Sequence, residues 1–352
     1  MKMKHATGFT LVEIMVSLAI AALLLSGIIQ VFITLKNTDN VSNALSRVQE
    51  GGRVALDMIS HDLRMAGFRG CVDPNLEANT EIIATSGLPA EFIDASLTGF
   101  DVTADNWGAG TVLADIDDST ADSATARLAS DVVNIMRFDA DAYPVSSHAP
   151  ATRTIVVTGL GADLAVNRFA AISDCSTASL FRITSSSASG NSTTLQHAAT
   201  ANSAMQYNYA SSNAELRPLL SNAYFVGKTG RLNQSGDVIY ALFRRDIDGN
   251  IAEIVEGVEN MQIQYGLEMT SGNRRFVNAT TATPNIETVT SARVYLLVAS
   301  NERILQSDDS NSYEMGDITI EPTASGGAVT YANDRRLRKV FSMTINLRNR
   351  RI

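Results

Sequence analysis

The sequence predicts an α+β fold in which one long N-terminal helix packs on a large, loop-rich, mainly antiparallel β head. Residues 9–35 form an almost uncharged apolar stretch, and residues 41–66 continue with apolar positions at helical spacing. Beyond residue 71 the chain instead carries short runs with the alternation typical of strands. A length of 352 residues leaves room for a sizeable core, and we expect the head to be one domain with two sheets.

Composition excludes several classes of protein. The 28 Lys and Arg residues against 37 Asp and Glu give a net charge of −9, which disfavours nucleic-acid binding through a broadly cationic surface. Two cysteines are too few for a disulfide-dense scaffold or a four-cysteine zinc site. With 45% hydrophobic and 18% charged residues, the chain is not wholly disordered.

The apolar segment is long enough to cross a membrane. Between residues 9 and 35 the only charge is Glu13, and the uncharged residues 14–35 span roughly 33 Å, against roughly 30 Å of hydrocarbon. Lys2 and Lys4 precede it and favour a cytoplasmic N-terminus. An ordinary secretory signal peptide fits poorly, because the apolar run is long and no A-x-A-like site follows it. A plain signal anchor leaves Glu13 unexplained, since an unpaired carboxylate in an apolar span costs several kcal/mol.

The residues around this carboxylate carry a known pattern. Residues 8–13 (GFTLVE), after a short basic leader and before the apolar helix, resemble the class III signal sequence of type IV pilins. The resemblance implies that a prepilin peptidase cuts between Gly8 and Phe9 and that Phe9 is N-methylated. It also implies that Glu13 pairs with the N-terminal amine of a neighbouring subunit, which is physically sound because a buried carboxylate and a buried amine each need a counter-ion. Pilin helices often carry a Pro in this half, whereas here Gly27 is the only helix-weakening residue.

After Lys36 the helical pattern becomes amphipathic. We expect one helix of about 58 residues, near 90 Å long, weakened or bent at Gly51 and Gly52 and stopped by Gly67 and Gly70. A coiled coil is the alternative, but no heptad persists long enough to favour it. The apolar positions of the amphipathic stripe are Val41, Leu45, Val48, Ala55, Ile59, Leu63 and Ala66.

The head is predicted from strand-like runs separated by loops. Loops rich in small and polar residues are expected at 185–194 and 198–204, and residues 77–129 read as long loops with short elements. The predicted strands are residues 132–138, 154–158, 180–184, 238–244, 261–267, 292–299 and 340–347.

Cys71 and Cys175 are the only cysteines. In an oxidising periplasm a disulfide between them is favoured, and closing a loop of about 104 residues would contribute on the order of 4–5 kcal/mol. Two independent buried thiols are the alternative.

Two acidic clusters raise the question of a metal site. Asp246, Asp248 and Asn250 are weak calcium candidates, but the glycine falls at the fourth rather than the sixth position, so a hairpin turn is favoured. For the second cluster a solvated loop is favoured over a metal site; its members are Asp115, Asp117, Asp118 and Asp122.

The sequence offers no catalytic motif, and we expect neither enzymatic activity nor a cofactor. There is no H-E-x-x-H, no G-x-S-x-G and no P-loop. His5 lies in the leader and His61 on the helix, while His148 and His197 fall in loop-like stretches.

The C-terminus concentrates positive charge around a strand. An edge strand protected by flanking charge is the favoured interpretation, and docking of an acidic subunit or of DNA is the alternative. The candidate docking residues are Arg335, Arg336, Arg338, Lys339, Arg348, Arg350 and Arg351.

Three further stretches sharpen the resemblance. They are residues 62–71 (DLRMAGFRGC), residues 256–266 (EGVENMQIQYG), and residues 337–341 (LRKVF) together with 347–350 (LRNR). With the N-terminal motif and the length, they resemble the PilW-type minor pilins of type IV pili, which are relatives of the J-type pseudopilins of type II secretion. The resemblance implies a type IV pilin-like fold.

The resemblance also implies a division of the chain and a role. Residues 1–8 would be the leader, 9–36 the transmembrane or filament-core half of the helix, 37–70 its amphipathic half, and 71–352 a periplasmic head. The protein would prime pilus assembly from the bacterial inner membrane and lie near the pilus tip. Its partners would be other minor pilins, a tip adhesin, the major pilin and the prepilin peptidase. The alternatives are a J-type pseudopilin, a minor pilin that contacts DNA during uptake, and a membrane-anchored periplasmic enzyme.

Overall fold

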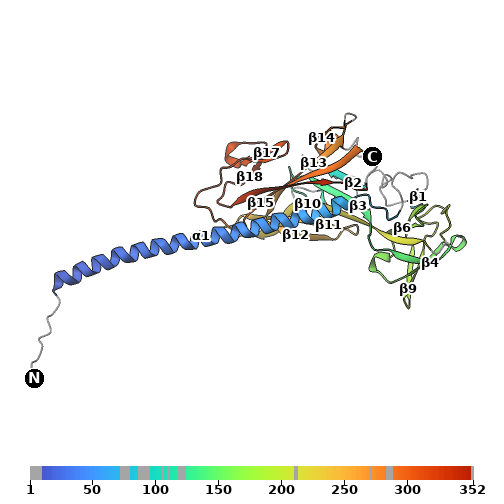
Figure 1. Cartoon of the computed structure of the whole chain (residues 1–352), viewed down its shortest axis with the longest axis horizontal. Coiled ribbons are helices and arrows are strands. Elements are labelled where there is room, and N and C mark those ends of the chain that lie inside the picture. Colours follow the sequence, from blue (N-terminus) through green and yellow to red (C-terminus); the bar gives the residue numbers. More distant parts are fainter. Residues whose placement is uncertain are drawn as a thin grey trace, which may run out of the picture.

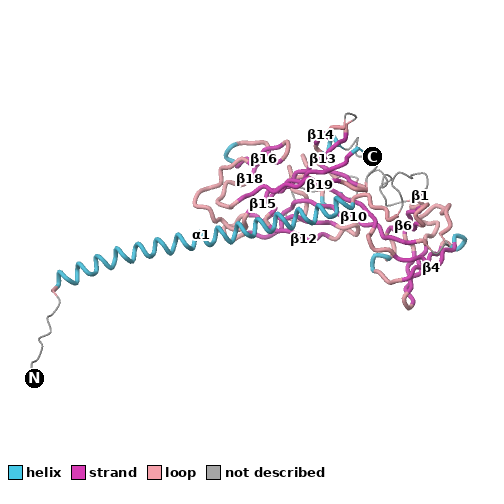
Figure 2. Tube along the Cα trace, viewed as in Figure 1, coloured by secondary structure: helices cyan, strands magenta, loops and turns pink. Residues whose placement is uncertain are grey.

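A long helix projects from one end of an elongated β head (Figure 1). The structure, a computed structural model, describes residues 10–71, 80–85, 96–104, 106–108, 111, 113–117, 124–209, 213–269, 272–282 and 288–349. The helix, α1, spans Leu11–Met65, 55 residues or about 80 Å. Its N-terminal half stands free, and its C-terminal half lies along the head (Figure 2).

Local sequence explains where α1 begins and ends. Thr10 is the N-cap, and its hydroxyl accepts the backbone N–H of Glu13. After Met65 the chain leaves the helix, and Gly67 and Gly70 adopt φ angles of +73° and +72°, a region that favours glycine. The predicted stop at these two glycines is confirmed.

The helix runs unbroken through Gly51 and Gly52, so the pair does not interrupt it. The glycines instead allow close packing against the head. A Cβ on Gly52 would come within 2.5 Å of the Phe341 ring, and one on Gly51 within 3.2 Å of Val255. Phe341 and Val255 lie on strands of two different sheets. The two glycines therefore allow α1 to pack between those sheets.

The described residues of the head form three sheets rather than the expected two. The largest has twelve strands: β1 (Thr80–Ile82), β2 (Leu97–Phe100), β3 (Val132–Phe138), β4 (Tyr143–Ala149), β5 (Thr154–Thr158), β6 (Phe169–Ser173), β7 (Ala178–Arg182), β8 (Ser185–Ser189), β9 (Ser192–Gln196), β10 (Glu215–Leu232), β11 (Val238–Arg245) and β12 (Ile251–Glu256).

A four-stranded sheet has the order β14-β13-β15-β19, and a small sheet contains β16, β17 and β18. Pairing is antiparallel except between β1 and β7 and between β17 and β18. The strands are β13 (Val258–Glu268), β14 (Arg274–Val277), β15 (Val289–Ala299), β16 (Tyr313–Met315), β17 (Ile318–Pro322), β18 (Val329–Tyr331) and β19 (Arg338–Asn346). One further short helix, α2, spans Ala279–Ala282, and short 3-10 helices cover Ala114–Ile116, Pro150–Thr152, Ala162–Leu164 and Thr323–Ser325.

Strand β10 joins the two parts of the largest sheet. Its first residues pair with β4 and β6, while the remainder pairs with β3 and β11. Strands β1 and β4–β9 therefore form a distal unit at the end of the molecule farthest from the free half of α1 (Figure 1).

The main core lies where α1 meets both larger sheets. Ala55, Ile59 and Leu63 are fully buried and pack with apolar residues of β3, β10, β13, β15 and β19. The distal unit has a separate core around Ile155, Phe181 and Leu195. The predicted amphipathic stripe thus attaches the helix to the head.

Most predicted strands are confirmed, with errors where sequence pattern is weak. Residues 132–138 and 154–158 match β3 and β5, while the strand expected at 180–184 begins two residues earlier as β7. The loop expected at 185–194 is wrong, because β8 and most of β9 form a hairpin there. Its serine-rich strands lack the apolar alternation that predicts strands.

Candidate functional site

Glu13 lies in the first turn of α1 and is exposed. The Thr10 hydroxyl donates to its carboxylate at 3.5 Å, and Ser17 donates to its backbone carbonyl at 2.7 Å. Among the described residues Glu13 forms no ion pair, so its carboxylate has room for a cation from another molecule. Gly8, Phe9, Lys2 and Lys4 lie outside the described residues.

The apolar half of α1 presents its side chains to the outside on every face. Each residue from 11 to 40 is exposed, including Leu11 and Leu23 at 74% and 73%. Among the described helices, α1 is the one long and apolar enough to cross a membrane. The apolar half and Glu13 therefore form one surface that needs a non-aqueous environment.

Asp62 connects α1 to the largest sheet, a role that the sequence did not reveal. Its carboxylate is buried and accepts hydrogen bonds from Asn222 Nδ2 at 2.7 Å and the Tyr224 hydroxyl at 2.8 Å. The Arg137 Nη2 atom forms an ion pair with Asp62 Oδ1 at 3.7 Å. The sequence feature that could have predicted this role is the position of Asp62 beside Ile59 and Leu63 on the apolar stripe. A carboxylate is buried there only when hydrogen-bond or ion-pair partners accompany it.

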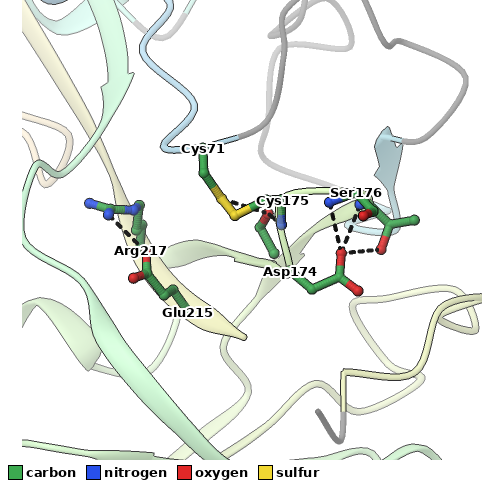
Figure 3. Close-up of a disulfide and its surroundings, with 8 residues drawn as sticks. Cys71, Asp174, Cys175, Ser176, Glu215 and Arg217 are labelled. Atoms are coloured by element: carbon green, nitrogen blue, oxygen red, sulfur yellow. Dashed lines mark hydrogen bonds and ion pairs between the residues drawn. A yellow bond between two sulfur atoms is a disulfide. The ribbon is translucent and has the colours of Figure 1, made fainter. Parts of the chain in front are cut away.

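Cys71 and Cys175 form a disulfide, with their Cα atoms 4.9 Å apart (Figure 3). Cys71 follows the end of α1, and Cys175 lies in the turn between β6 and β7. Asp174 holds this turn by accepting the N–H groups of Ser176 and Thr177. The bond therefore joins the end of the helix to the distal unit.

Two of the candidate docking cations are internal, which corrects their proposed role. Arg336 and Arg338 are buried, and both form ion pairs with Glu259 and Asp334. Arg338 also lies 3.4 Å from Asp309. The sequence could not show this, because Glu259 is on β13 and far away along the chain.

The remaining candidate cations are differently placed. Arg335, Lys339 and Arg348 are exposed, and Arg350 and Arg351 lie outside the described residues. Strand β19 is an edge strand of its sheet, as expected, and α1 packs against it. Docking through these cations stays a proposal.

The weak calcium candidates form the turn between β11 and β12. The Asp246 carboxylate accepts the backbone N–H groups of Asp248 and Asn250 and the Asn250 side-chain amide. Asp248 pairs with Arg168. These hydrogen bonds also hold the pKa of Asp246 below its ordinary value, although burial opposes them.

The other acidic cluster is divided. Asp115 pairs with Arg245 at 2.5 Å, and buried Asp117 accepts the N–H of Gly108 at 2.8 Å. Asp118 and Asp122 lie outside the described residues. Within the described ranges, no three His, Cys, Asp or Glu side chains are grouped as a metal site would require.

His148 and His197 are buried in the distal unit; the expected loop position holds for His197 and is wrong for His148. His148 is on β4, and its Nδ1 accepts the backbone N–H of Tyr209 at 3.0 Å. His197 directly follows β9, with its ring centroid 6.1 Å from that of His148. Burial lowers the pKa of His197 to about 4, with further contributions from His148 and Arg153.

The structure brings the resembling stretches together in pairs. Arg338, from 337–341, pairs with Glu259, from 256–266. Asn349 donates its side-chain amide to the backbone carbonyl of Arg64 at 3.3 Å, which joins the chain end to residues 62–71. These contacts tie α1 and the four-stranded sheet into one assembly.

Two family models match parts of the chain. Residues 223–349 match the family model described as type IV pilus-assembly protein W. Residues 3–29 match the model described as the prokaryotic N-terminal methylation motif. Searches of curated proteins and of solved structures found no match. Together the two matches support a minor pilin of the PilW type.

Proposed function

We propose that this minor pilin primes assembly of the type IV pilus and lies at or near the tip with other minor pilins and a tip adhesin. The observation that carries the proposal is the exposed apolar half of α1, with Glu13 in its first turn, joined to a folded head. Such a helix waits in the inner membrane and then moves into a filament core, since both environments exclude water. The head is periplasmic before assembly.

Processing and register follow from the same helix. The prepilin peptidase removes residues 1–8 and exposes the Phe9 amine, which is then methylated. Residues 9–36 are the membrane and filament-core half, 37–70 the amphipathic half, and 71–352 the head. The Glu13 carboxylate pairs with the N-terminal amine of the adjacent subunit in the water-free filament core, where an unpaired charge is strongly disfavoured.

The size of the head supports a terminal position. Three sheets and a distal unit beyond the end of α1 make a bulky head, which is hard to repeat along a tightly packed filament. A subunit of this shape fits the end of a filament, where neighbours lie on one side only.

The pairing of Glu13 is tested with Glu13→Gln. The amide keeps the shape of the side chain but removes its charge, so we expect normal leader cleavage and reduced assembly. Immunoblots report cleavage, and electron microscopy of cells reports pilus number. Normal piliation by the cleaved variant would contradict the pairing.

The priming and tip role has a separate test. A deletion strain should make fewer pili, and the purified full-length protein should retain other minor pilins and the adhesin in a pull-down. Normal pilus number without any co-purifying minor pilin would overturn this role. Complementation with the wild-type chain is the control.

A further inference from the structure

The four-stranded sheet has two unlike faces. Its inner face is apolar and packs in the main core through residues such as Ile263, Tyr265 and Val294. One half of its outer face is covered by the small sheet, where Leu297 packs with Met315 and Tyr331. The other half, on β14, β13, β15 and β19, has no such cover among the described residues.

The uncovered half carries a defined set of side chains, which we call the open face. Tyr265 and Val277 are opposite each other and buried, so alternation along the strands places their neighbours Gly266 and Phe276 on the outer side. The open face comprises Gly266, Glu268, Arg274, Phe276, Ser291, Arg293, Thr344 and Asn346. Arg274, Thr344 and Asn346 are exposed, and Phe276 and Arg293 are half-buried.

The two arginines of the open face are held in place. The Arg293 guanidinium lies 4.0 Å from the centre of the Phe276 ring, and its Nε donates to Thr344 Oγ1 at 3.0 Å. Arg274 donates to Asn346 Oδ1 at 3.3 Å. Stacking and a hydrogen bond orient the Arg293 guanidinium, and one hydrogen bond orients that of Arg274, so both keep several N–H donors unused.

The described residues of the open face have a net positive charge, because they include two arginines and one carboxylate, that of Glu268. Among the described residues neither Arg274 nor Arg293 forms an ion pair, although Glu268 is opposite Arg274 in register. At the other end of the same sheet, Arg338 is instead fully ion-paired. Oriented guanidinium groups with free N–H donors are suited to bidentate binding of carboxylates.

We propose that the open face binds an acidic, extended segment of a partner pilus subunit. The arginines stand beside Thr344 and Asn346, two residues apart on β19, a separation of about 7 Å along the strand. Carboxylates at alternate positions of an extended segment have the same spacing. Charge complementarity and spacing thus select a segment with Asp or Glu at i and i+2. The inference rests on the proposed assembly role and specifies one contact within it.

The test uses purified full-length protein in detergent and a fluorescent peptide with Glu at alternate positions, separated by Thr. We expect the peptide to bind, the same peptide with Gln to bind at least about tenfold more weakly, and added salt to weaken binding. The double variant Arg274→Gln, Arg293→Gln should lose at least about tenfold in affinity with an unchanged melting temperature. Arg293→Lys should lose part of it, since lysine keeps the charge but not the bidentate geometry.

Arg275→Gln is the matched control. Arg275 is the exposed neighbour of Arg274 on the opposite side of β14, so its variant removes one charge without altering the open face. An equal loss in this variant, or equal binding of the Glu and Gln peptides, would overturn the proposal. Tighter binding of a single-stranded oligonucleotide to the same arginines would also overturn it and assign the face to nucleic acid. Because the readout is peptide binding, it is independent of the piliation tests.

Discussion

Arg338 is held by carboxylates from separate parts of the chain. Its Nε donates to Glu259 at 2.7 Å, its Nη1 donates to Asp334 at 2.9 Å, and the Tyr331 ring centre lies 4.3 Å away. Burial alone would lower the pKa of Arg338, but the carboxylates of Glu259 and Asp334 more than offset it, so the pKa is raised. The residue is therefore a structural cation that joins β13 to the start of β19.

Removing this cation should destabilise the head severely. Arg338→Ala leaves Glu259 and Asp334 buried without their partner, and we expect a loss of about 3–5 kcal/mol in the free energy of unfolding. The control Arg335→Ala, at an exposed neighbour, should change it by no more than about 0.5 kcal/mol. Urea unfolding of both variants measures the difference, and equal effects would contradict the structural role.

His197 should make stability depend on pH. The residue is 1% exposed, and no described residue hydrogen-bonds to either ring nitrogen. The folded-state pKa is lowered to about 4, so below pH 6.5 the unfolded chain binds a proton that the folded chain does not. The free energy of unfolding is therefore undiminished by His197 above pH 6.5, and it falls by on the order of 3 kcal/mol as the pH drops to about 4.

Denaturant unfolding at several pH values checks this dependence. His197→Phe removes the titrating group and keeps an aromatic ring beside Phe181, so much of the loss between pH 6.5 and 4 should disappear. His148, whose pKa burial also lowers, should account for part of the remaining slope. An unchanged slope in His197→Phe would show that other groups dominate.

At the scale of the element, α1 contains the same residue type in two unlike environments. Nothing lies within 4 Å of a Cβ built on Gly27, whereas one on Gly52 would meet the Phe341 ring at 2.5 Å. Gly27 is thus a helix-weakening residue in free surroundings, and Gly52 is a packing residue.

One substitution should therefore have opposite effects at these positions. Gly27→Ala should stabilise the helix by about 0.5–1 kcal/mol, and Gly52→Ala should destabilise the helix–head contact by about 1–3 kcal/mol. Far-UV circular dichroism follows unfolding of the helix in Gly27→Ala, and fluorescence of the single tryptophan, Trp107, follows unfolding of the head in Gly52→Ala. A Gly52→Ala head as stable as wild type would contradict the close packing. If local melting at Gly27 aids assembly, Gly27→Ala should also reduce piliation.

At the scale of the whole molecule, the distal unit is attached to the rest through β10 and the disulfide. The disulfide spans 104 residues between the end of α1 and the β6–β7 turn. In a chain-entropy account, a long closed loop restricts the unfolded chain and leaves the folded one unchanged.

Removal of the disulfide should lower the free energy of unfolding by on the order of 4–5 kcal/mol. The variant Cys71→Ser, Cys175→Ser and reduced wild-type protein should unfold at the same lower urea concentration. Reductant should leave the double variant unchanged, which is the control. If reductant leaves wild-type stability unaffected, the bond does not stabilise the chain.

Local patterns sufficed for the helix and for several strands. The stop at Gly67 and the apolar stripe are each recognised from a few neighbouring residues, because helix formation depends on contacts three and four positions apart. The strands β3 and β5 were found because their apolar content is high. The serine-rich β8 was missed, because only its pairing with β9 makes it a strand.

The division of the C-terminal cations shows what local pattern omits. Arg338 and Lys339 are adjacent and similar in sequence, yet one is buried in an ion-pair cluster and the other is exposed. Their difference depends on Glu259, which is brought near only when β13, β15 and β19 pair. The helix, its processing motif and its membrane-crossing length are properties of neighbouring residues, so they can be predicted from the sequence. The packing of Gly52 against Phe341, the ion-pair cluster and the open face depend on residues far apart in sequence, so they exist only once the sheets have formed.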